Sequence, residues 1–196
     1  MTDSRTDAEL AELCLDGDES AARELISRFE RPVFSLIYRM VRDRELAEDL
    51  AQEAFVKTFN NMRMYDPQQK FSSWLFKIAY NLTIDYLRRK RVPTVSLQGA
   101  PDAVTPDQQA ATTITPEAPG LGPEDRAEAS ELGTHLERAI ARLRPEYRTA
   151  IILRHVQGYP YGEIADVMDK PLGTVKTYIH RARHELRDAL AYLRDE

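Results

Sequence analysis

The side chains best suited to chemistry in this chain gather in the segment 161–187. Its second half has an apolar stripe, spaced by 4, 3 and 4 residues, along one side of a predicted helix: Val175, Ile179, Ala182 and Leu186. Between these lie hydrogen-bonding and cationic side chains, the types that contact bases and phosphates: Thr174, Lys176, Thr177, Tyr178, His180, Arg181, Arg183 and His184. The pattern favours recognition of nucleic acid.

A shorter helix precedes this one, across a tight turn. Ile164, Ala165 and Met168 form its packing face. Two helices joined in this way form a helix-turn-helix, whose second helix enters the major groove. An ordinary helical hairpin with a solvated basic face is the alternative, because charge runs usually mark solvated surfaces.

The segment 71–91 combines aromatic and basic side chains on one predicted helix. The aromatic residues are Phe71, Trp74, Phe76, Tyr80 and Tyr86, and the basic run is Arg88, Arg89, Lys90 and Arg91. Single-stranded nucleic acid needs both, since bases stack on rings for roughly 1–3 kcal/mol each while cations follow the phosphates. Alternatively, Phe76, Tyr80 and Tyr86 are core residues, and the basic run only complements the helix dipole.

A third predicted helix carries an acidic face that suits a protein partner better than DNA. The polar members of this face are Glu45, Glu48, Asp49, Gln52 and Glu53, and they lie beside apolar Leu50 and Phe55. A merely solvated acidic surface is the alternative interpretation.

Enzymatic chemistry has little support in this sequence. The four histidines, His135, His155, His180 and His184, lie in no arrangement with a thiol, serine or carboxylate that suggests a catalytic site. His180 and His184 have metal-ligand spacing but no third ligand nearby. The single cysteine, Cys14, excludes an internal disulfide and a cysteine-cluster metal site. We therefore predict no catalytic residue, no metal and no cofactor.

The net charge of −5 is unevenly distributed along the chain. Residues 1–19 carry a net charge of −6 and residues 94–130 carry −5, whereas residues 20–93 carry +5. The overall acidity therefore does not argue against DNA binding. No apolar run approaches the roughly 20 residues that span a bilayer, and no secretory signal opens the chain. We expect a cytoplasmic protein without membrane insertion.

The predicted fold is all-α, with two small helical bundles joined by a flexible linker. An acidic segment (1–19) contains a short helix that packs on the first domain (20–93), where helices are expected near 19–41, 45–62 and 72–91. Pro32 is expected to kink or interrupt the first of these three. A proline-containing acidic linker follows at 94–130. The second domain is 131–196, with helices near 131–143 and 145–158 before the helix-turn-helix.

Three segments in this order resemble a bacterial RNA polymerase sigma factor of the extracytoplasmic-function (ECF, group IV sigma-70) family. AEDLAQEAFVKTF (47–59) is similar to region 2.2, and FSSWLFKIAYNLTIDYLRRKR (71–91) to regions 2.3 and 2.4. The segment 143–187 is similar to region 4. The resemblance implies a non-enzymatic protein that binds core RNA polymerase and directs promoter-specific initiation. It also implies an inhibitory anti-sigma partner.

The resemblance assigns roles to individual residues. Asp49, Gln52 and Glu53 would contact the clamp helices of the largest polymerase subunit, and the second domain would contact the flap of the second-largest subunit. The minus-ten element would be captured by Asp66, Lys70, Phe71, Trp74, Asn81, Asp85, Arg88 and Arg89. The minus-35 duplex would face Thr174, Lys176, Thr177, His180, Arg181 and Arg183. Met168-Asp169 departs from the Leu-Gly expected at the turn, and Gln68-Gln69-Lys70 leaves the base in the minus-ten pocket open.

The main rival is a conventional helix-turn-helix regulator that binds duplex DNA alone, as a dimer on a palindrome. The aromatic-basic helix and the acidic helix argue against it. Because each stacked step is worth about 1.4 kcal/mol, a small bundle cannot offset a whole bubble alone. We therefore expect promoter melting only when the protein is bound to core polymerase.

Overall fold

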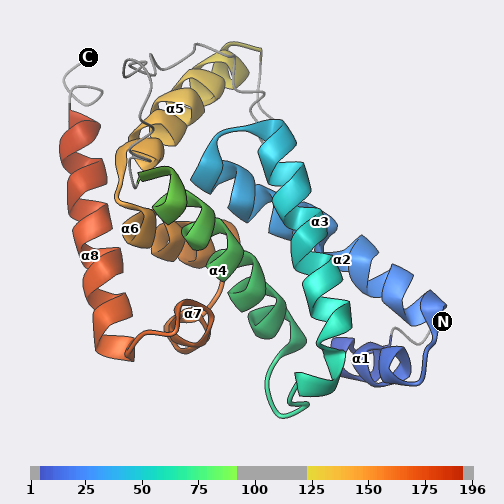
Figure 1. The fold of residues 1–196 in the computed structure, drawn as a ribbon. Helices are drawn as coiled ribbons and strands as arrows, with labels where there is room; N and C mark the ends of the chain where they lie inside the picture. The colour runs from blue at the N-terminus through green and yellow to red at the C-terminus, as the bar shows by residue number, and fades with distance from the viewer. Residues whose placement is uncertain (1–4, 92–122, 192–196) are drawn as a thin grey trace, which may run out of the picture.

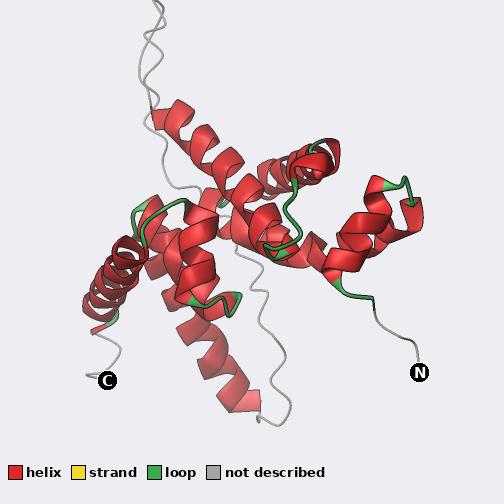
Figure 2. Cartoon of the chain, turned by 90° about the horizontal axis from the view of Figure 1, so that it is seen from below, coloured by secondary structure: helices red, strands yellow, loops and turns green. Residues whose placement is uncertain are grey.

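The computed structural model describes residues 5–91 and 123–191, and the regular elements in these ranges are all helical (Figures 1 and 2). The N-terminal half contains α1 (Asp7–Leu15), α2 (Glu19–Val41), α3 (Arg44–Asn60), the 3₁₀ turn η1 (Met62–Met64) and α4 (Phe71–Arg91). The C-terminal half contains α5 (Pro123–Arg142), α6 (Pro145–Ile151), the π-helical turn η2 (Ile152–Val156), α7 (Tyr161–Met168) and α8 (Leu172–Ala189). The all-α prediction is confirmed.

Capping side chains explain where the long helices of the N-terminal half begin. The Asp18 carboxylate accepts hydrogen bonds from the backbone N–H groups of Ser20 and Ala21, at 2.8 and 3.3 Å, and so starts α2. Asp43 caps α3 in the same way, through the N–H of Leu46 at 3.1 Å. The possibility that Pro32 interrupts the first long helix is wrong, since α2 runs through it continuously.

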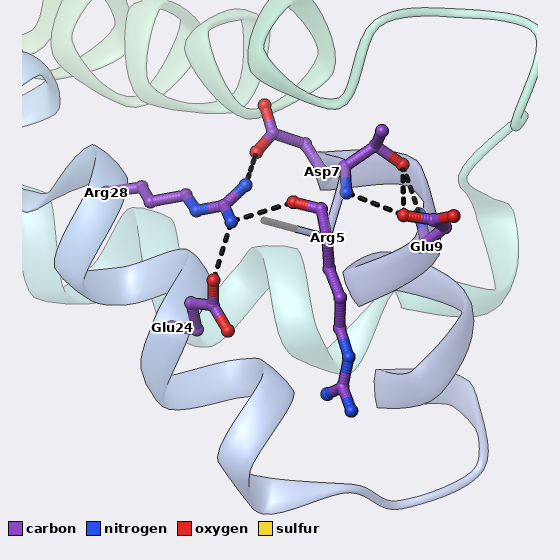
Figure 3. Close-up of polar contacts among 6 residues, drawn as sticks. Arg5, Asp7, Glu9, Glu24 and Arg28 are labelled. Carbon is purple, nitrogen blue, oxygen red and sulfur yellow. Dashed lines mark hydrogen bonds and ion pairs between the residues drawn. The ribbon is translucent and has the colours of Figure 1, made fainter. Parts of the chain in front are cut away.

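One arginine holds α1 on the side of α2 (Figure 3). The Arg28 guanidinium donates to Asp7 Oδ1 at 2.6 Å, to the backbone oxygen of Arg5 at 2.8 Å and to Glu24 Oε1 at 2.5 Å. Thr6 and Glu9 form a capping box at the start of α1. The short helix expected near Asp7 is therefore present, with Thr6 rather than Asp7 as its N-cap.

A second arginine organises the start of the C-terminal half. The Arg148 guanidinium donates to the backbone oxygens of Ile140 (3.2 Å), Leu143 (3.0 Å) and Ala141. These carbonyls belong to the end of α5 and the turn into α6, where helix geometry leaves acceptors without intrahelical partners, although the Ile140 oxygen also accepts from the N–H of Leu143 at 3.1 Å. Arg148 thereby fixes the angle between the two helices. The first helix of this half begins at Pro123 rather than near 131, so residues 123–130 of the expected linker are helical. The rest of that predicted linker, residues 94–122, lies outside the described residues.

The helix-turn-helix predicted at 161–187 is present as α7 and α8. Ile164, Val167 and Met168 of α7 are buried. So are Val175, Ile179 and Ala182 of α8, which are members of the predicted apolar stripe. Asp169 ends α7 in the left-handed conformation, with φ of 52°. An aspartate can therefore supply the geometry for which glycine was expected.

The two halves pack against each other, which the sequence did not predict. α4 lies beside α7, and α2 lies beside α6 (Figure 1). The Arg148 guanidinium reaches the backbone oxygen of Met40 at 2.7 Å, and the Gln157 amide reaches that of Pro32 at 3.2 Å. Buried apolar side chains from both halves form one continuous cluster. Two helical bundles are present, as expected. They are connected by the polypeptide and also pack on each other through a shared interface.

Candidate nucleic-acid and polymerase interfaces

The predicted minus-35 side chains lie along the outer face of α8. Lys176, Thr177 and His180 are exposed, opposite the buried stripe, and Thr174 is half-buried. Arg181 is exposed and donates to the Tyr147 hydroxyl at 3.2 Å. The structure therefore brings these side chains together on one face that is open to solvent.

Arg183 completes this face and contacts a histidine that sequence reasoning left unused. Its Nη2 lies 3.1 Å from His155 Nε2. Burial, with Arg183 and Arg154 nearby, lowers the pKa of His155. The imidazole is therefore neutral at pH 7, where Nε2 can accept a hydrogen bond from Arg183 and fix its guanidinium at the edge of α8.

The predicted minus-ten loop rests on an aromatic cluster beneath it. Phe71 is only 2% exposed, and its ring centroid lies 5.7 Å from that of Phe29 and 5.6 Å from that of Tyr65. The Tyr65 hydroxyl donates to the backbone oxygen of Gln69 at 2.7 Å, which holds the loop that contains exposed Asp66. Phe71 thus supports the loop from inside. Tyr65 was missed, although its place just before the Asp66-Pro67 turn was a usable signal.

The exposed part of this region forms a stripe along α4. Trp74 is half-buried and lies 5.3 Å from Tyr65 between ring centroids. Farther along, four predicted residues are exposed at helical spacing: Asn81, Asp85, Arg88 and Arg89. Asp85 and Arg88 are 3.7 Å apart. Aromatic and cationic groups therefore follow one edge of α4, as nucleic-acid binding requires.

Three aromatic residues of α4 were assigned alternatively to the core. Phe76 is 1% exposed and Tyr80 5% exposed. Burial raises the pKa of Tyr80 to about 12, so its hydroxyl stays protonated. Tyr86 is half-buried. The core interpretation is therefore confirmed for Phe76 and Tyr80, and these rings are unavailable for base stacking in this conformation.

The acidic face of α3 is presented to solvent as a compact patch. Ala47, Leu50 and Ala54 are buried on the opposite side of the helix. Asp49, Gln52 and Glu53 are all exposed. Val56, which the sequence interpretation overlooked, is 57% exposed beside them. A single exposed apolar side chain is common on protein surfaces, so Val56 alone does not separate a partner surface from a solvated one.

In the described part of the chain, no three side chains of His, Cys, Asp or Glu form a group that could hold a metal ion. His184, which was considered as a ligand, pairs with Asp188 at 2.9 Å. None of the described helices has the length and apolar character needed to cross a membrane.

Cys14 is expected to react slowly with alkylating agents. Burial, and secondarily the carboxylate of Asp18, raise the pKa of this thiol. At pH 8 the folded protein then holds less thiolate than an exposed cysteine does. Iodoacetamide should modify the native protein at least about threefold more slowly than the urea-unfolded chain, as followed by mass spectrometry. Equal rates in the two states would contradict this environment.

Comparison with known proteins gives matches across both halves. Residues 25–92 match the family model for sigma-70 region 2, and residues 135–186 match that for sigma-70 region 4. The ECF RNA polymerase sigma factor SigW of Bacillus subtilis is 37% identical over 175 residues, covering 89% of this chain and 91% of that protein. The ECF RNA polymerase sigma-E factor of Escherichia coli K12 is 32% identical over 188 residues, with 95% of each chain covered.

Solved structures show the same fold at lower identity. CnrH, solved in complex with the cytosolic domain of CnrY, has a TM-score of 0.67 and 21% identity, covering 96% of this chain and 99% of that one. The sigma factor RpoE of Bartonella quintana, solved with the anti-sigma factor NepR, has a TM-score of 0.64 and 21% identity, covering 86% and 96%. The sequence matches show that this chain, which carries the α3, α4 and α8 surfaces, belongs to the ECF sigma factor family. Proteins of this family direct promoter-specific transcription initiation by core RNA polymerase.

Proposed function

We propose that this protein docks on core RNA polymerase through α3, reads the minus-35 element with α8 and captures the minus-ten element with α4 and the loop before it. The observation that carries the proposal is the presence of three differently built surfaces on one chain. One is acidic with an apolar edge, one is aromatic and basic, and one is the polar face of a recognition helix.

The minus-35 assignment is supported by the exposure of the α8 face. A recognition helix places its first turns deepest in the major groove. Thr174, Lys176 and Thr177 lie in the first turns of α8, and His180 follows one turn later. Arg181 and Arg183 lie farther along, where cations reach phosphates at the groove edge.

The minus-ten assignment is supported by the position of Trp74 beside the loop. Its half-buried ring lies 5.3 Å from that of Tyr65, which holds the loop, and an unstacked base could stack on the exposed part of the Trp74 ring. Lys70 and Asp66 supply polar atoms on the loop, and Arg88 and Arg89 would follow the phosphates. Phe71, from its buried place, would hold Trp74 and the loop in register.

The polymerase assignment rests on Asp49, Gln52 and Glu53, which face solvent as one patch on a rigid helix. We also propose that the C-terminal half contacts the flap of the second-largest subunit. An inhibitory anti-sigma partner is proposed by analogy with the Bartonella quintana RpoE complex. The expected absence of enzymatic activity and of a cofactor follows from the same proposal, since the polymerase supplies the chemistry.

The direct test is to mix the purified full chain with core RNA polymerase, follow co-elution and then run transcription from genomic promoter fragments. We expect stable co-elution and new start sites that core polymerase alone does not produce. Tight binding to palindromic duplex DNA without any binding to core would instead establish the conventional regulator.

A further inference from the structure

We infer that Tyr147 and His155 are positioning residues, which hold the guanidiniums of Arg181 and Arg183 on opposite edges of α8 for contact with the two strands of DNA. The inference deepens the function proposed above and rests on it, because that function places α8 in the major groove. Both anchors lie outside α8. Tyr147 belongs to α6, which packs against α8, and His155 belongs to η2, which directly continues α6 (Figure 1).

The two arginines lie on opposite edges of the exposed face of α8. Residues of an α-helix follow one another at about 100°, so two residues that are two positions apart are separated by roughly 160° around the axis. Ala182, between the arginines in sequence, is buried, whereas Arg181 and Arg183 are exposed. On the side away from Ala182, the exposed residues Thr177 and His180 lie in the arc between the two arginines. One arginine therefore flanks this face on each side.

The first anchor is the hydroxyl of Tyr147. This residue is 6% exposed, and its ring centroid lies 5.4 Å from that of Tyr178, so the packing fixes the place of the hydroxyl. Arg181 Nη1 donates to the hydroxyl at 3.2 Å. The bond to Tyr147 raises the pKa of Arg181, with a smaller contribution from the carboxylate of Glu185. A buried ring thus holds an exposed guanidinium at one edge of α8.

The second anchor is the imidazole of His155, which a π-helical turn presents to α8. The N–H of Gln157 donates to the backbone oxygen of Ile152, five residues earlier, at 3.1 Å. Turns of this kind are rare and are frequent at functional sites. His155 Nε2 lies 3.1 Å from Arg183 Nη2. Since a guanidinium has no acceptor atom, this contact takes a neutral imidazole whose proton is on Nδ1.

Both anchors are uncharged, unlike the carboxylates that hold other arginines of the chain. Arg39, for example, pairs with Glu137 at 2.9 Å. A carboxylate neutralises a guanidinium and occupies the position of a phosphate oxygen, whereas a hydroxyl or an imidazole nitrogen leaves the charge and the remaining N–H donors available. Within residues 5–91 and 123–191, neither Arg181 nor Arg183 forms an ion pair with a carboxylate. The two side chains are held in place while their charges remain free for DNA.

This arrangement fits the major groove. The groove is about 12 Å wide and a helix with its side chains is about 10–12 Å across, so the two edges of an inserted helix face the phosphates of opposite strands. Arg181 then contacts one strand and Arg183 the other. Fixing a long side chain before binding removes an ordering cost that corresponds to about two- to tenfold in affinity for each arginine.

The test is a double-mutant cycle for each pair, measured by fluorescence anisotropy on the full chain. The probe is a labelled duplex of about two helical turns, selected from a random library on the wild-type protein. Tyr147→Phe removes only the hydroxyl, His155→Leu removes the acceptor, and His155→Gln keeps an acceptor near the Nε2 position. Each change is made with and without alanine at its arginine. Tyr38→Phe, on α2, is the matched control, and circular dichroism verifies folding.

We expect Tyr147→Phe and His155→Leu each to weaken binding about three- to tenfold in the wild-type background, and less than about 1.5-fold once the partner arginine is alanine. His155→Gln and Tyr38→Phe should stay within about 1.5-fold of wild type. The salt dependence separates position from charge. Arg181→Ala should lower the slope of log affinity against log salt by about one, whereas Tyr147→Phe, which keeps the guanidinium, should leave the slope unchanged.

The strand assignment is tested with methylphosphonates, which remove the charge of single phosphates on one strand at a time. Arg181→Ala should become insensitive to substitutions on one strand only, and Arg183→Ala to substitutions on the other. Loss of sensitivity on the same strand in both variants would overturn the assignment. Equal losses in both backgrounds of a cycle would show that the anchor only stabilises the fold, and would overturn its positioning role.

An arm without DNA separates this inference from the proposed function. In the side-chain NMR spectrum of the free chain, Tyr147→Phe should speed rotation about the Nε–Cζ bond of Arg181 but not of Arg183, and His155→Leu should do the reverse. Unchanged rotation in both variants would overturn the two positioning roles. If no duplex is selected, or if alanine at both arginines leaves affinity unchanged, the proposed role of α8 and the strand contacts fail, while the NMR result still decides the positioning.

Discussion

Replacing Asp49, Gln52 and Glu53 together by alanine is expected to abolish binding to core polymerase and promoter-dependent transcription. The three side chains point outward from one side of α3, while Leu50 and Ala54 face the core. Interface side chains that contribute measurably to binding cost more than about 1 kcal/mol each when they are truncated, so losing three predicts at least a roughly 100-fold weaker complex. Size-exclusion co-elution and run-off transcription measure the two effects.

Folding should be unaffected, because these residues are exposed and, within the described part of the chain, Glu53 alone of the three forms an ion pair, with Lys57 at 2.9 Å. The control is Glu12→Ala/Asp16→Ala, which also removes two negative charges, from an exposed residue of α1 and from its C-cap. If the triple variant still binds core polymerase, the polymerase interface does not include this face of α3. Equal loss in the control would show that net charge alone is responsible.

Arg148→Ala is expected to lower the free energy of unfolding by about 2–4 kcal/mol, since hydrogen bonds from a charged group are each worth about 1.5–3 kcal/mol. The guanidinium contacts carbonyls at the end of α5 and the backbone oxygen of Met40, and these acceptors would lose their donor together. For a chain of this size the melting temperature should fall by roughly 5–15 °C. Calorimetry of the full chain measures both quantities.

Two variants separate the geometry of the guanidinium from its charge. Arg148→Lys keeps the charge but cannot reach several carbonyls at once, so it should recover only part of the stability. Arg144→Ala removes an exposed arginine four residues away and should change the free energy by less than about 0.5 kcal/mol. A melting temperature unchanged in Arg148→Ala would show that water replaces the guanidinium without loss.

Much of the helical architecture is predictable because local signals agree with one another. α2 begins and ends where its apolar periodicity and the cap at Asp18 place it. The exposed face of α8 follows directly from the buried stripe on the other side. The start of α5 was predicted less well. Its first residues are polar and acidic and were assigned to the linker, although a proline such as Pro123 is favourable at the first position of a helix. At Pro32, burial of neighbouring side chains in α2 outweighs one lost backbone bond.

The contact between the halves could not be predicted from periodicity. A stripe shows that Phe76 is buried, but it cannot show that Tyr159, far along the chain, covers it. The same limit applies to the candidate site. Phe71 was grouped with the DNA-facing residues by its position in the motif, and only the packing of Phe29 and Tyr65 around it reveals an internal role.

The left-handed turn at Asp169 has an evolutionary consequence. Glycine adopts φ of 52° more readily than aspartate, so selection for a stable turn alone would favour glycine. Aspartate retains a carboxylate there, and that carboxylate pairs with Lys77. Aspartate and glycine codons differ by a single base. One point mutation can therefore relax the turn and remove the ion pair together, and relatives could diverge in how firmly α7 is held against α4 without any change to the surfaces that we propose to read DNA.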